Sequence, residues 1–429
     1  MEQRPSVHID PPQQAQGYWA KSWKQFRKNR MAVWAMRFLF VLLMISLFAD
    51  FIANDKPIYC KIEGQRYWPI FKSYGVQLGI AKWDRRFLPA NWENQEYEYE
   101  IPALIPYSAS GIDYRNGNFK SPFGEQQIDS WTERHWMGTD QLGRDVAAGM
   151  VAGTRVAMMV GLIAMSIATL IGLCLGAVAG YYGDHRLQVS RIRLLLNGLG
   201  IVLAFFYAFM VRRYQLQESG TELLKSLAIA VGIMILVNLL ARALKGLPYL
   251  GQRITIAADL IIMRFIETFT SIPGLLLLLA LLSIIHRPSI FNIMVIIGLM
   301  SWTGIARFIR AELLRIRQLE YIEAAQAMGF SEWRILLRHA IPNALGPVLI
   351  TIAFGIASAI LAEAFLSFVG IGVEEDQVTW GKLLSLARRS AHAWWLAVFP
   401  GFAIFITVTA FNLIGEGLTD AIDPRTRQG

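Results

Sequence analysis

The chain has 429 residues, of which 54% are hydrophobic and 17% are charged. Soluble globular domains are about 45–50% apolar and about 25% charged, so this composition excludes an ordinary water-soluble protein as well as a disordered chain. The net charge of +9 is compatible with nucleic-acid binding, so the places where the basic residues lie along the chain decide its meaning.

Eight apolar windows are candidates for membrane-spanning helices, because a helix needs about 20 mostly apolar residues to cross the hydrocarbon core of a bilayer. Six are clear, at residues 31–53, 156–180, 268–285, 288–306, 343–362 and 393–415. Two shorter windows, 194–211 and 226–241, form a hairpin that either crosses the membrane or lies on its surface. In the second window, Gly172, Gly176 and Gly180 share one helical face, which favours close helix packing. The sequence therefore predicts an all-α integral membrane protein.

Residues 1–30 form a basic segment ahead of the first window, and no small-residue cleavage site follows that window. We therefore interpret residues 31–53 as an uncleaved first transmembrane helix whose basic flank stays in the cytoplasm. Residues 54–135 then lie outside and carry 10 Lys and Arg against 11 Asp and Glu. Because the excess positive charge lies in the segments predicted to be cytoplasmic, it indicates membrane orientation, and we expect no nucleic-acid partner.

The outer segment 54–135 is rich in aromatic residues, is interrupted by Gly and Pro, and shows no long helical periodicity. We expect it to be a small, loop-rich extracytoplasmic insert. Packing and interface anchoring are the favoured roles for its aromatic side chains, with ligand contact as the alternative.

The sequence of the loop 307–342, which we expect to be cytoplasmic, predicts two short helices set at an angle. Good helix formers run through Met328, Gly329 is suited to a left-handed stop, and Ser331 can cap a second helix that Pro342 is expected to end. A DNA-binding helix-turn-helix has the same outline. About 35 residues held between two spanning helices cannot easily enter a major groove, which leaves a structural connector or a docking element.

The same loop carries the pattern E-A-A, three residues, G, nine residues, H, two residues, P. This pattern resembles the cytoplasmic loop of permease subunits of binding-protein-dependent ABC importers. The resemblance implies that its short helices seat in a groove on an ATPase subunit, with small alanines allowing close approach and Glu323 offering a charge to a basic partner or a neighbouring Arg. Carried over residue by residue, the ATPase-coupling positions are Glu323, Ala324, Ala325, Gly329, Phe330, Arg334, His339 and Pro342.

Residues 137–145, M-G-T-D-Q-L-G-R-D, resemble the G-T-D-x-x-G-R-D element that precedes the second spanning helix in the dipeptide, oligopeptide and nickel permease group. The glycines are expected to allow a tight turn, and Asp140, Arg144 and Asp145 to form a local ion-pair network at the outer membrane face. We favour this structural role over direct ligand contact. The matching positions are Gly138, Thr139, Asp140, Gly143, Arg144 and Asp145.

Residues 362–372 and 411–424 also match this group, and residues 51–57 are similar to the start of the enlarged outer segment in permeases related to the microcin C and peptide importer. The resemblance implies a type I ABC importer transmembrane domain over residues 136–424, with six core spanning helices in the chain. An inserted hairpin, residues 184–257, departs from the group and leaves the helix count at six plus two, or six plus a surface hairpin. Residues 425–429 form a C-terminal tail, placed in the cytoplasm with the N-terminus.

No G-x-x-x-x-G-K-[ST] motif, Ser/His/Asp set or metal-ligand spacing occurs in the sequence. We therefore expect no enzyme activity, cofactor or metal in this chain, and ATP hydrolysis on separate subunits. The resemblance implies a multi-pass bacterial inner-membrane permease that works by alternating access. Its implied partners are a second homologous permease, two ABC ATPase subunits and an extracytoplasmic solute-binding protein.

The substrate class stays open among peptides, peptide-like antibiotics, nickel chelates and other small solutes, with peptides favoured. An autonomous channel or secondary transporter is the first alternative, but the clear windows contain almost no ionisable residues of the kind such proteins place at mid-membrane. A membrane-anchored regulator that uses the helix-turn-helix outline is the second.

Overall fold

The computed structural model describes residues 18–422 with gaps at 85–86, 88–91, 93–94, 213–214, 216–219, 247–250, 285–288, 373 and 375. Residues 1–17 of the predicted basic segment 1–30, and the whole predicted tail 425–429, lie outside the described residues. The chain divides into two compact units. The first comprises Met1–Leu173, Ile272–Ile309 and Pro342–Gly429, and the second comprises Cys174–Ser271 and Arg310–Ile341.

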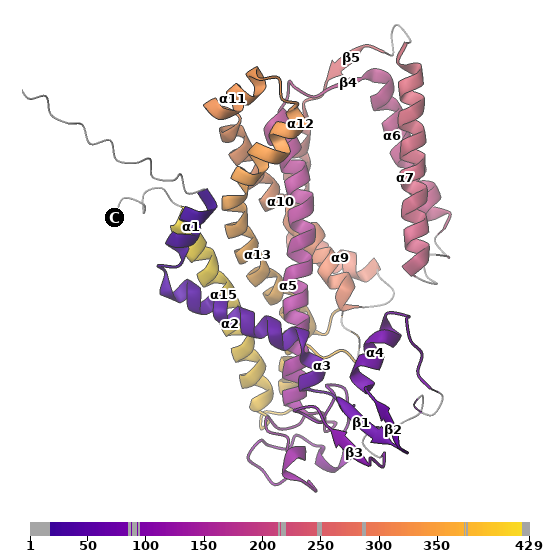
Figure 1. The fold of residues 1–429 in the computed structure, drawn as a ribbon, viewed down its shortest axis with the longest axis vertical. Coiled ribbons are helices and arrows are strands. Elements are labelled where there is room, and N and C mark those ends of the chain that lie inside the picture. Colours follow the sequence, from indigo (N-terminus) through magenta and orange to yellow (C-terminus); the bar gives the residue numbers. More distant parts are fainter. Residues whose placement is uncertain are drawn as a thin grey trace, which may run out of the picture. The chain divides into compact units, whose positions relative to one another are not determined.

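Helices dominate the first unit (Figure 1). Its helices, including those that begin or end in it, are α1 Tyr18–Phe26, α2 Arg30–Leu47, α3 Ala49–Ile52, α4 Pro69–Gln77, α5 Val146–Ala177, α9 Gly274–Ile284, α10 Ile290–Ile316, α13 Ile341–Val369, α14 Trp380–Leu386 and α15 Trp395–Ile422. Short 3-10 turns lie at Tyr114–Asn116, Trp131–Glu133 and Ala387–Arg389.

The outer insert contains a small antiparallel sheet in the order β2-β1-β3, formed by β1 Tyr59–Ile62, β2 Gln65–Tyr67 and β3 Tyr99–Ile101. Cys60, Phe87 and Trp92 are buried beside this sheet, and the rings of Phe87 and Trp92 stack with their centroids 5.1 Å apart. The insert is therefore more regular than the loop-rich cap we predicted, and part of its aromatic content forms a core of its own. Strands this short leave too little alternation for sequence analysis to detect.

The second unit contains a helical hairpin and the short helices of the 307–342 loop (Figure 1). Its elements are the π-helical turn Val178–Tyr182, β4 Gln188–Ser190, α6 Arg191–Phe205, the π-helical turn Phe206–Met210, α7 Gly220–Ala243, the 3-10 turn Leu244–Gly246, β5 Arg253–Thr255, α8 Ala258–Thr270, α11 Glu320–Ala327, α12 Glu332–Ile335 and the π-helical turn Leu336–Ala340. The strands β4 and β5 pair in antiparallel fashion at the base of the hairpin.

Seven helices in the described part of the chain are long and apolar enough to cross a membrane, and α8 with α9 forms a broken pair that can count as an eighth. Both hairpin helices pass this test, with mean hydropathies of 1.9 and 2.1. Because α8 and α9 are separated by a bend, the predicted window 268–285 is wrong as a continuous helix. The helix ends at Thr270 and restarts at Gly274 because Pro273 has no N–H and its ring clashes with a preceding helical turn.

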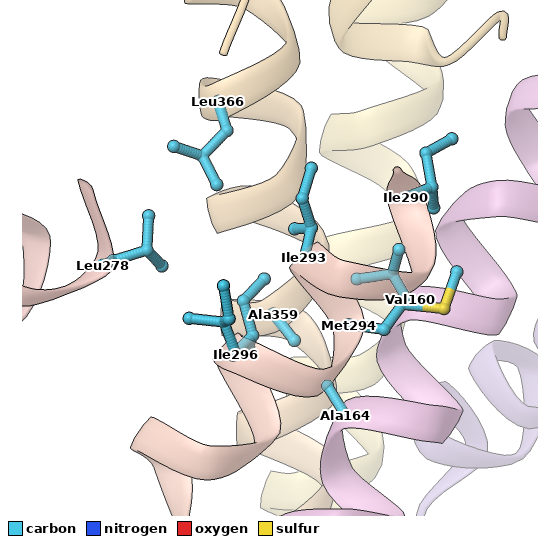
Figure 2. Close-up of a cluster of buried hydrophobic side chains, with 10 residues drawn as sticks. Val160, Ala164, Leu278, Ile290, Ile293, Met294, Ile296, Ala359 and Leu366 are labelled. Carbon is cyan, nitrogen blue, oxygen red and sulfur yellow. The ribbon is translucent and has the colours of Figure 1, made fainter. Parts of the chain in front are cut away.

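Close helix packing forms the core of the first unit. Figure 2 shows apolar side chains of α5, α9, α10 and α13 meeting in one buried cluster. A Cβ added at Gly172 of α5 would lie 2.7 Å from the Cβ of Ile305, which confirms the predicted use of small residues in helix packing. Such contacts matter because lipid offers no hydrophobic driving force between helices, so van der Waals packing must hold them together.

Candidate functional site

The loop that we predict to couple to an ATPase subunit contains, in the second unit, α11, a sharp turn and α12. Gly329 follows α11 with φ +77°, the left-handed conformation predicted for it, and Ser331 has the extended backbone of an N-cap before α12. The turn lets two short helices meet at an angle. Glycine suits this position because a residue with a Cβ adopts this φ only with strain.

The helix after the turn does not end at Pro342, contrary to our prediction. The chain passes from α12 through the π-helical turn Leu336–Ala340 directly into α13, and residues Glu332–Val369 form one continuous helical stretch. The wider π turn removes the regular i to i−4 pairing at the point where the proline ring would clash with it. Pro342 thus follows the π-helical turn directly and is accommodated inside the continuous helical stretch.

The predicted coupling residues divide by exposure. Glu323 and Ala324 are exposed on α11, whereas Ala325 is only 4% exposed and packs inside the chain. Ala324 is therefore the alanine of this pair whose side chain is accessible at the surface of α11. No ion pair joins Glu323 to a neighbouring Arg within the described residues, which leaves its carboxylate open to solvent.

Phe330 and Arg334 lie together on the second arm of the loop, where the guanidinium carbon of Arg334 lies 4.8 Å from the centroid of the Phe330 ring. His339 lies in the π-helical turn and is half-buried.

Large apolar side chains that sequence analysis missed extend the exposed surface of this loop. Tyr321, Met328 and Trp333 are 42%, 66% and 62% exposed. Single apolar residues on a surface are common, but three within 13 residues beside an exposed alanine indicate a surface for protein contact. Hydropathy windows could not find them because such windows average over many residues and do not report the exposure of single side chains.

A clamp in the same unit holds the base of α10 to the start of α8. Arg310 donates from Nε and Nη2 to the carboxylate of Asp259, the latter bond over 2.6 Å. The backbone of Gly180 lies so close to α10 that an added Cβ would be 2.7 Å from the Arg310 carbonyl oxygen. Asp184 accepts a hydrogen bond from the Leu260 N–H. The segment after α5, α8 and the end of α10 thus form one connected base in the unit that carries the coupling loop.

The outer-face motif of the first unit forms the turn that starts α5. Thr139 and Asp145 form an antiparallel bridge, and Asp145 Oδ1 accepts the Ala148 N–H over 2.6 Å, which caps the helix. Asp140 Oδ1 accepts the N–H groups of Leu142 and Arg144. The glycines at 138 and 143 have φ +78° and +89°, as a tight turn requires.

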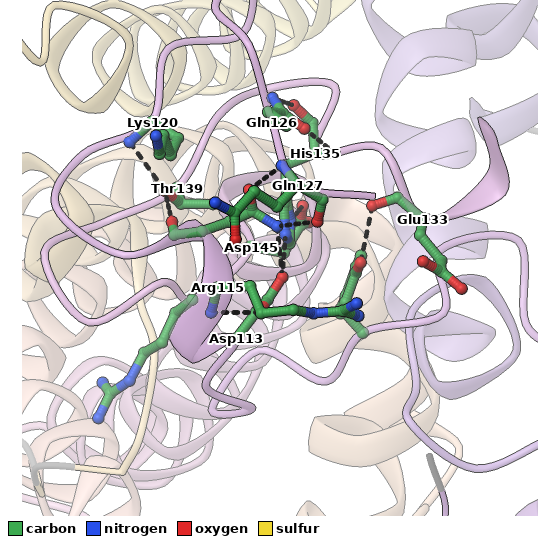
Figure 3. Close-up of polar contacts among 12 residues, drawn as sticks. Asp113, Arg115, Lys120, Gln126, Gln127, Glu133, His135, Thr139 and Asp145 are labelled. Atoms are coloured by element: carbon green, nitrogen blue, oxygen red, sulfur yellow. Dashed lines mark hydrogen bonds and ion pairs between the residues drawn. The ribbon is translucent and has the colours of Figure 1, made fainter. Parts of the chain in front are cut away.

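The ion-pair network predicted among Asp140, Arg144 and Asp145 is wrong. No ion pair of Arg144 occurs among the described residues, and its buried Nε has no hydrogen-bond partner there. Asp145 instead contacts His135, with Oδ2 2.7 Å from Nδ1, and the other ring nitrogen of His135 lies 3.2 Å from Asp113 Oδ2 (Figure 3). Sequence analysis missed this chain because its members lie 10 and 22 residues apart in segments with no regular periodicity.

His135 is completely buried between the two carboxylates and stacks on Tyr107 at a centroid distance of 4.3 Å. Burial alone would lower the pKa of His135, but hydrogen bonds and charge from Asp145 and Asp113 outweigh it and raise the pKa. Burial would likewise raise the pKa of Asp113, but hydrogen bonds from Asn116, His135 and the Arg115 N–H lower it. This buried Asp-His-Asp chain ties the outer insert to the start of α5.

A second clamp joins α2, α3 and the insert to α5. Arg155 Nη1 and Nη2 donate to the two carboxylate oxygens of Asp50 over 3.0 and 2.8 Å, and Nε donates to the Ser46 carbonyl over 3.1 Å. Tyr74 of α4 also donates to Asp50. The pairing satisfies an arginine in a helix that is otherwise apolar, which is the usual requirement for charge near a membrane core.

Comparison with known proteins identifies the family. Residues 249–428 match the model of the binding-protein-dependent transport system inner membrane component, and residues 17–67 match the N-terminal TM domain of oligopeptide transport permease C. The chain is similar to the inner membrane ABC transporter permease protein YejE of Escherichia coli strain K12, with 28% identity over 94% of this chain and 96% of that protein.

Two further relatives agree. The peptidoglycan transport system permease protein YejE of Agrobacterium fabrum is 27% identical over 94% of this chain and 92% of its own length. The dipeptide transport system permease protein DppC of Bacillus subtilis is 30% identical over 68% of this chain and 70% of its own length. With the apolar helices, these matches show that the chain belongs to the inner-membrane permease family of binding-protein-dependent ABC transport systems.

Proposed function

We propose that this permease imports peptides or peptide-like solutes, and that its 307–342 loop couples the transport path to ATPase subunits. The observation that carries the coupling proposal is the exposed face of α11 and α12, where Glu323 and Ala324 lie in one short segment with Met328 and Trp333. A compact polar and apolar surface of this kind suits a groove on a partner protein.

The base of the second unit supplies a route by which motion of the loop can reach the membrane helices. Closure of the ATPase subunits on ATP would displace α11 and α12. Because α12 continues into α13 without a break, and Arg310 ties α10 to α8, a displacement at the loop moves several helices together. The pathway then opens to one side of the membrane at a time.

The same proposal assigns partners and topology. A second homologous permease completes the pathway, two ABC ATPase subunits hydrolyse ATP, and a solute-binding protein delivers substrate to the outer face. Both termini lie in the cytoplasm, in accordance with the basic residues before α2, and the hairpin α6–α7 crosses the membrane. Peptides are the favoured substrate class because the relatives include permeases named for dipeptide and oligopeptide transport.

The test uses the complete transporter purified from cells that express this chain with its partner subunits. Glu323→Lys reverses an exposed charge that has no ion pair in the described structure, so the fold should survive while substrate-stimulated ATPase activity and retention of the ATPase subunits fall several-fold. Gly329→Arg should lower both further, because it also strains the turn. Glu96→Lys, an exposed charge reversal on the insert, is the matched control.

Coupling through this loop is refuted if Glu323→Lys and Gly329→Arg both retain the activity and subunit content of the Glu96→Lys complex. The peptide assignment is tested separately, through a shift in melting temperature of the partner binding protein with di- and oligopeptides. A shift with nickel chelates and none with peptides would replace it.

A further inference from the structure

A groove of about 950 Å³ lies along the α6–α7 hairpin, within the second unit. Three arginines from three different elements line one end of it: Arg193 in the first turn of α6, Arg242 in the last turn of α7, and Arg253 in β5. The pairing of β4 with β5 holds this end together, since Arg253 is in register with Ser190, the residue before α6.

The positive charge at this end is not balanced by acidic side chains. Arg193 donates from Nε to the neutral amide oxygen of Asn238 over 3.1 Å, and no ion pair of Arg242 or Arg253 is found in the part of the chain that the structure describes. All three arginines are exposed. Like charges gathered around a groove repel one another unless an anion lies between them.

The opposite end of the hairpin has the reverse arrangement. There Arg212 and Lys225 both pair with Glu222, and Arg212 also donates to Ser226. The single carboxylate of Glu222 thus offsets part of the positive charge of Arg212 and Lys225. Among the described residues, the excess positive charge is therefore larger at the base, with its three arginines, than at this end.

The base lies on the same side as the coupling loop. Arg186, which precedes β4, approaches Glu332 of α12 with an N–O distance of 3.9 Å. A basic end beside polar loops suits the headgroup region of a membrane. The long apolar stretch beyond it suits the hydrocarbon core.

The wall of the groove is apolar beyond the arginines. Val231, Ile235 and Leu239 recur every four residues along α7, and each is more than half exposed. Val231 lies 11 residues before Arg242, so this wall extends about 16 Å along the helix axis at about 1.5 Å per residue. A small soluble anion would not contact this apolar wall, whereas a hydrocarbon chain would cover it.

We propose that this groove binds an anionic glycerophospholipid, with its phosphate diester at Arg193, Arg242 and Arg253 and one acyl chain along Val231, Ile235 and Leu239. Arginine guanidinium groups bind phosphate oxygens through charge-assisted, often bidentate hydrogen bonds. Basic pockets between membrane helices are suited to anionic headgroups for this reason. The proposal concerns the inserted hairpin alone and does not rest on ATPase coupling or on the substrate.

The experiment titrates the full-length chain, purified in a neutral detergent, with dioleoyl phosphatidylglycerol and with dioleoyl phosphatidylcholine, and counts bound lipids by native mass spectrometry. The wild-type chain should retain phosphatidylglycerol in preference to phosphatidylcholine. The combined variant Arg193→Gln, Arg242→Gln, Arg253→Gln should bind phosphatidylglycerol at least tenfold more weakly. Lys225→Gln, which removes one positive charge from the other end of the hairpin, should bind it as the wild type does.

Two outcomes would overturn the proposal: equal phosphatidylglycerol binding by the triple variant and Lys225→Gln, or displacement of the bound lipid by millimolar inorganic phosphate, which would assign the site to a soluble anion. A melting curve of the triple variant checks its fold. If that variant melts early, Arg253→Gln alone replaces it, because this exposed side chain lies in a short surface strand, and it should bind the lipid severalfold more weakly. Wild-type affinity in Arg253→Gln would then count against the proposal.

Discussion

Replacement of Gly143 by alanine tests the outer-face motif most directly. Gly143 has φ +89°, and a Cβ at this position would lie 2.0 Å from the carbonyl oxygen of Asp113 and 2.9 Å from its carbonyl carbon. The methyl group cannot fit, so the backbone at Asp113 must move by about 1.5 Å before a normal van der Waals contact is restored. Since Asp113 also contacts His135, the movement loosens the buried Asp-His-Asp chain.

The magnitude has two parts. A residue with a Cβ in the left-handed region costs about 1–2 kcal/mol, and forcing a methyl group into a filled site costs about 1–3 kcal/mol more. Gly143→Ala should therefore lower the free energy of unfolding by about 2–5 kcal/mol. Gly64 has φ +77° with no atom within 4 Å of the added Cβ, so Gly64→Ala carries the backbone cost alone and is the matched control.

Thermal unfolding of both variants and the wild type, followed by tryptophan fluorescence in the same detergent, gives the comparison. The drop in melting temperature for Gly143→Ala should be at least twice that for Gly64→Ala. Equal drops would mean that the close approach of Gly143 to Asp113 does not exist in the folded protein, and the reasoning from packing would fail.

Three further predictions concern charged contacts. The pKa of His135 is raised in the folded protein, so the contacts of its charged form stabilise the fold fully below its ordinary pKa of 6.5 and are lost as the pH rises through the raised value. The melting temperature of the wild type should therefore fall more between pH 6 and 9 than that of His135→Asn. Parallel pH profiles of the two proteins would contradict this. Arg155→Met should lower stability by about 1–3 kcal/mol because it leaves Asp50 without its bidentate partner, and a double-mutant cycle with Asp50→Asn should recover part of the loss. Arg310→Lys keeps the charge but loses the two-point contact with Asp259, so substrate-stimulated ATPase activity of the complex should fall. Arg310→Gln, which also removes the charge, should lower this activity further. Equal activity in both variants and the wild type would refute a coupling role for this clamp.

Local sequence was sufficient for features whose cause is local. Helix hydrogen bonds join residues four apart, so an apolar window of sufficient length predicts a spanning helix. In the described segments, seven continuous helices lie where windows or their extensions indicated them. The positive φ of Gly329 followed in the same way from the residue type beside a helix end. The family was predictable because short motifs lie in continuous segments.

Features that depend on distant neighbours were predicted wrongly or missed. Ala324 is exposed and Ala325 is buried because of what packs against α11, and the sequence of the loop contains no such information. Asp145 was predicted to form an ion-pair network with the nearby Asp140 and Arg144. In the folded chain its partner is His135 instead.

The sequence by itself determined that this chain spans a membrane and to which permease family it is similar. Only the tertiary structure decided that the 268–285 window is broken, that helix continues through Pro342, and that Arg310 meets Asp259 across 51 residues. The physical reason is that hydropathy and turn propensity act over a few residues, whereas ion pairs and close packing are set by segments that meet only after folding.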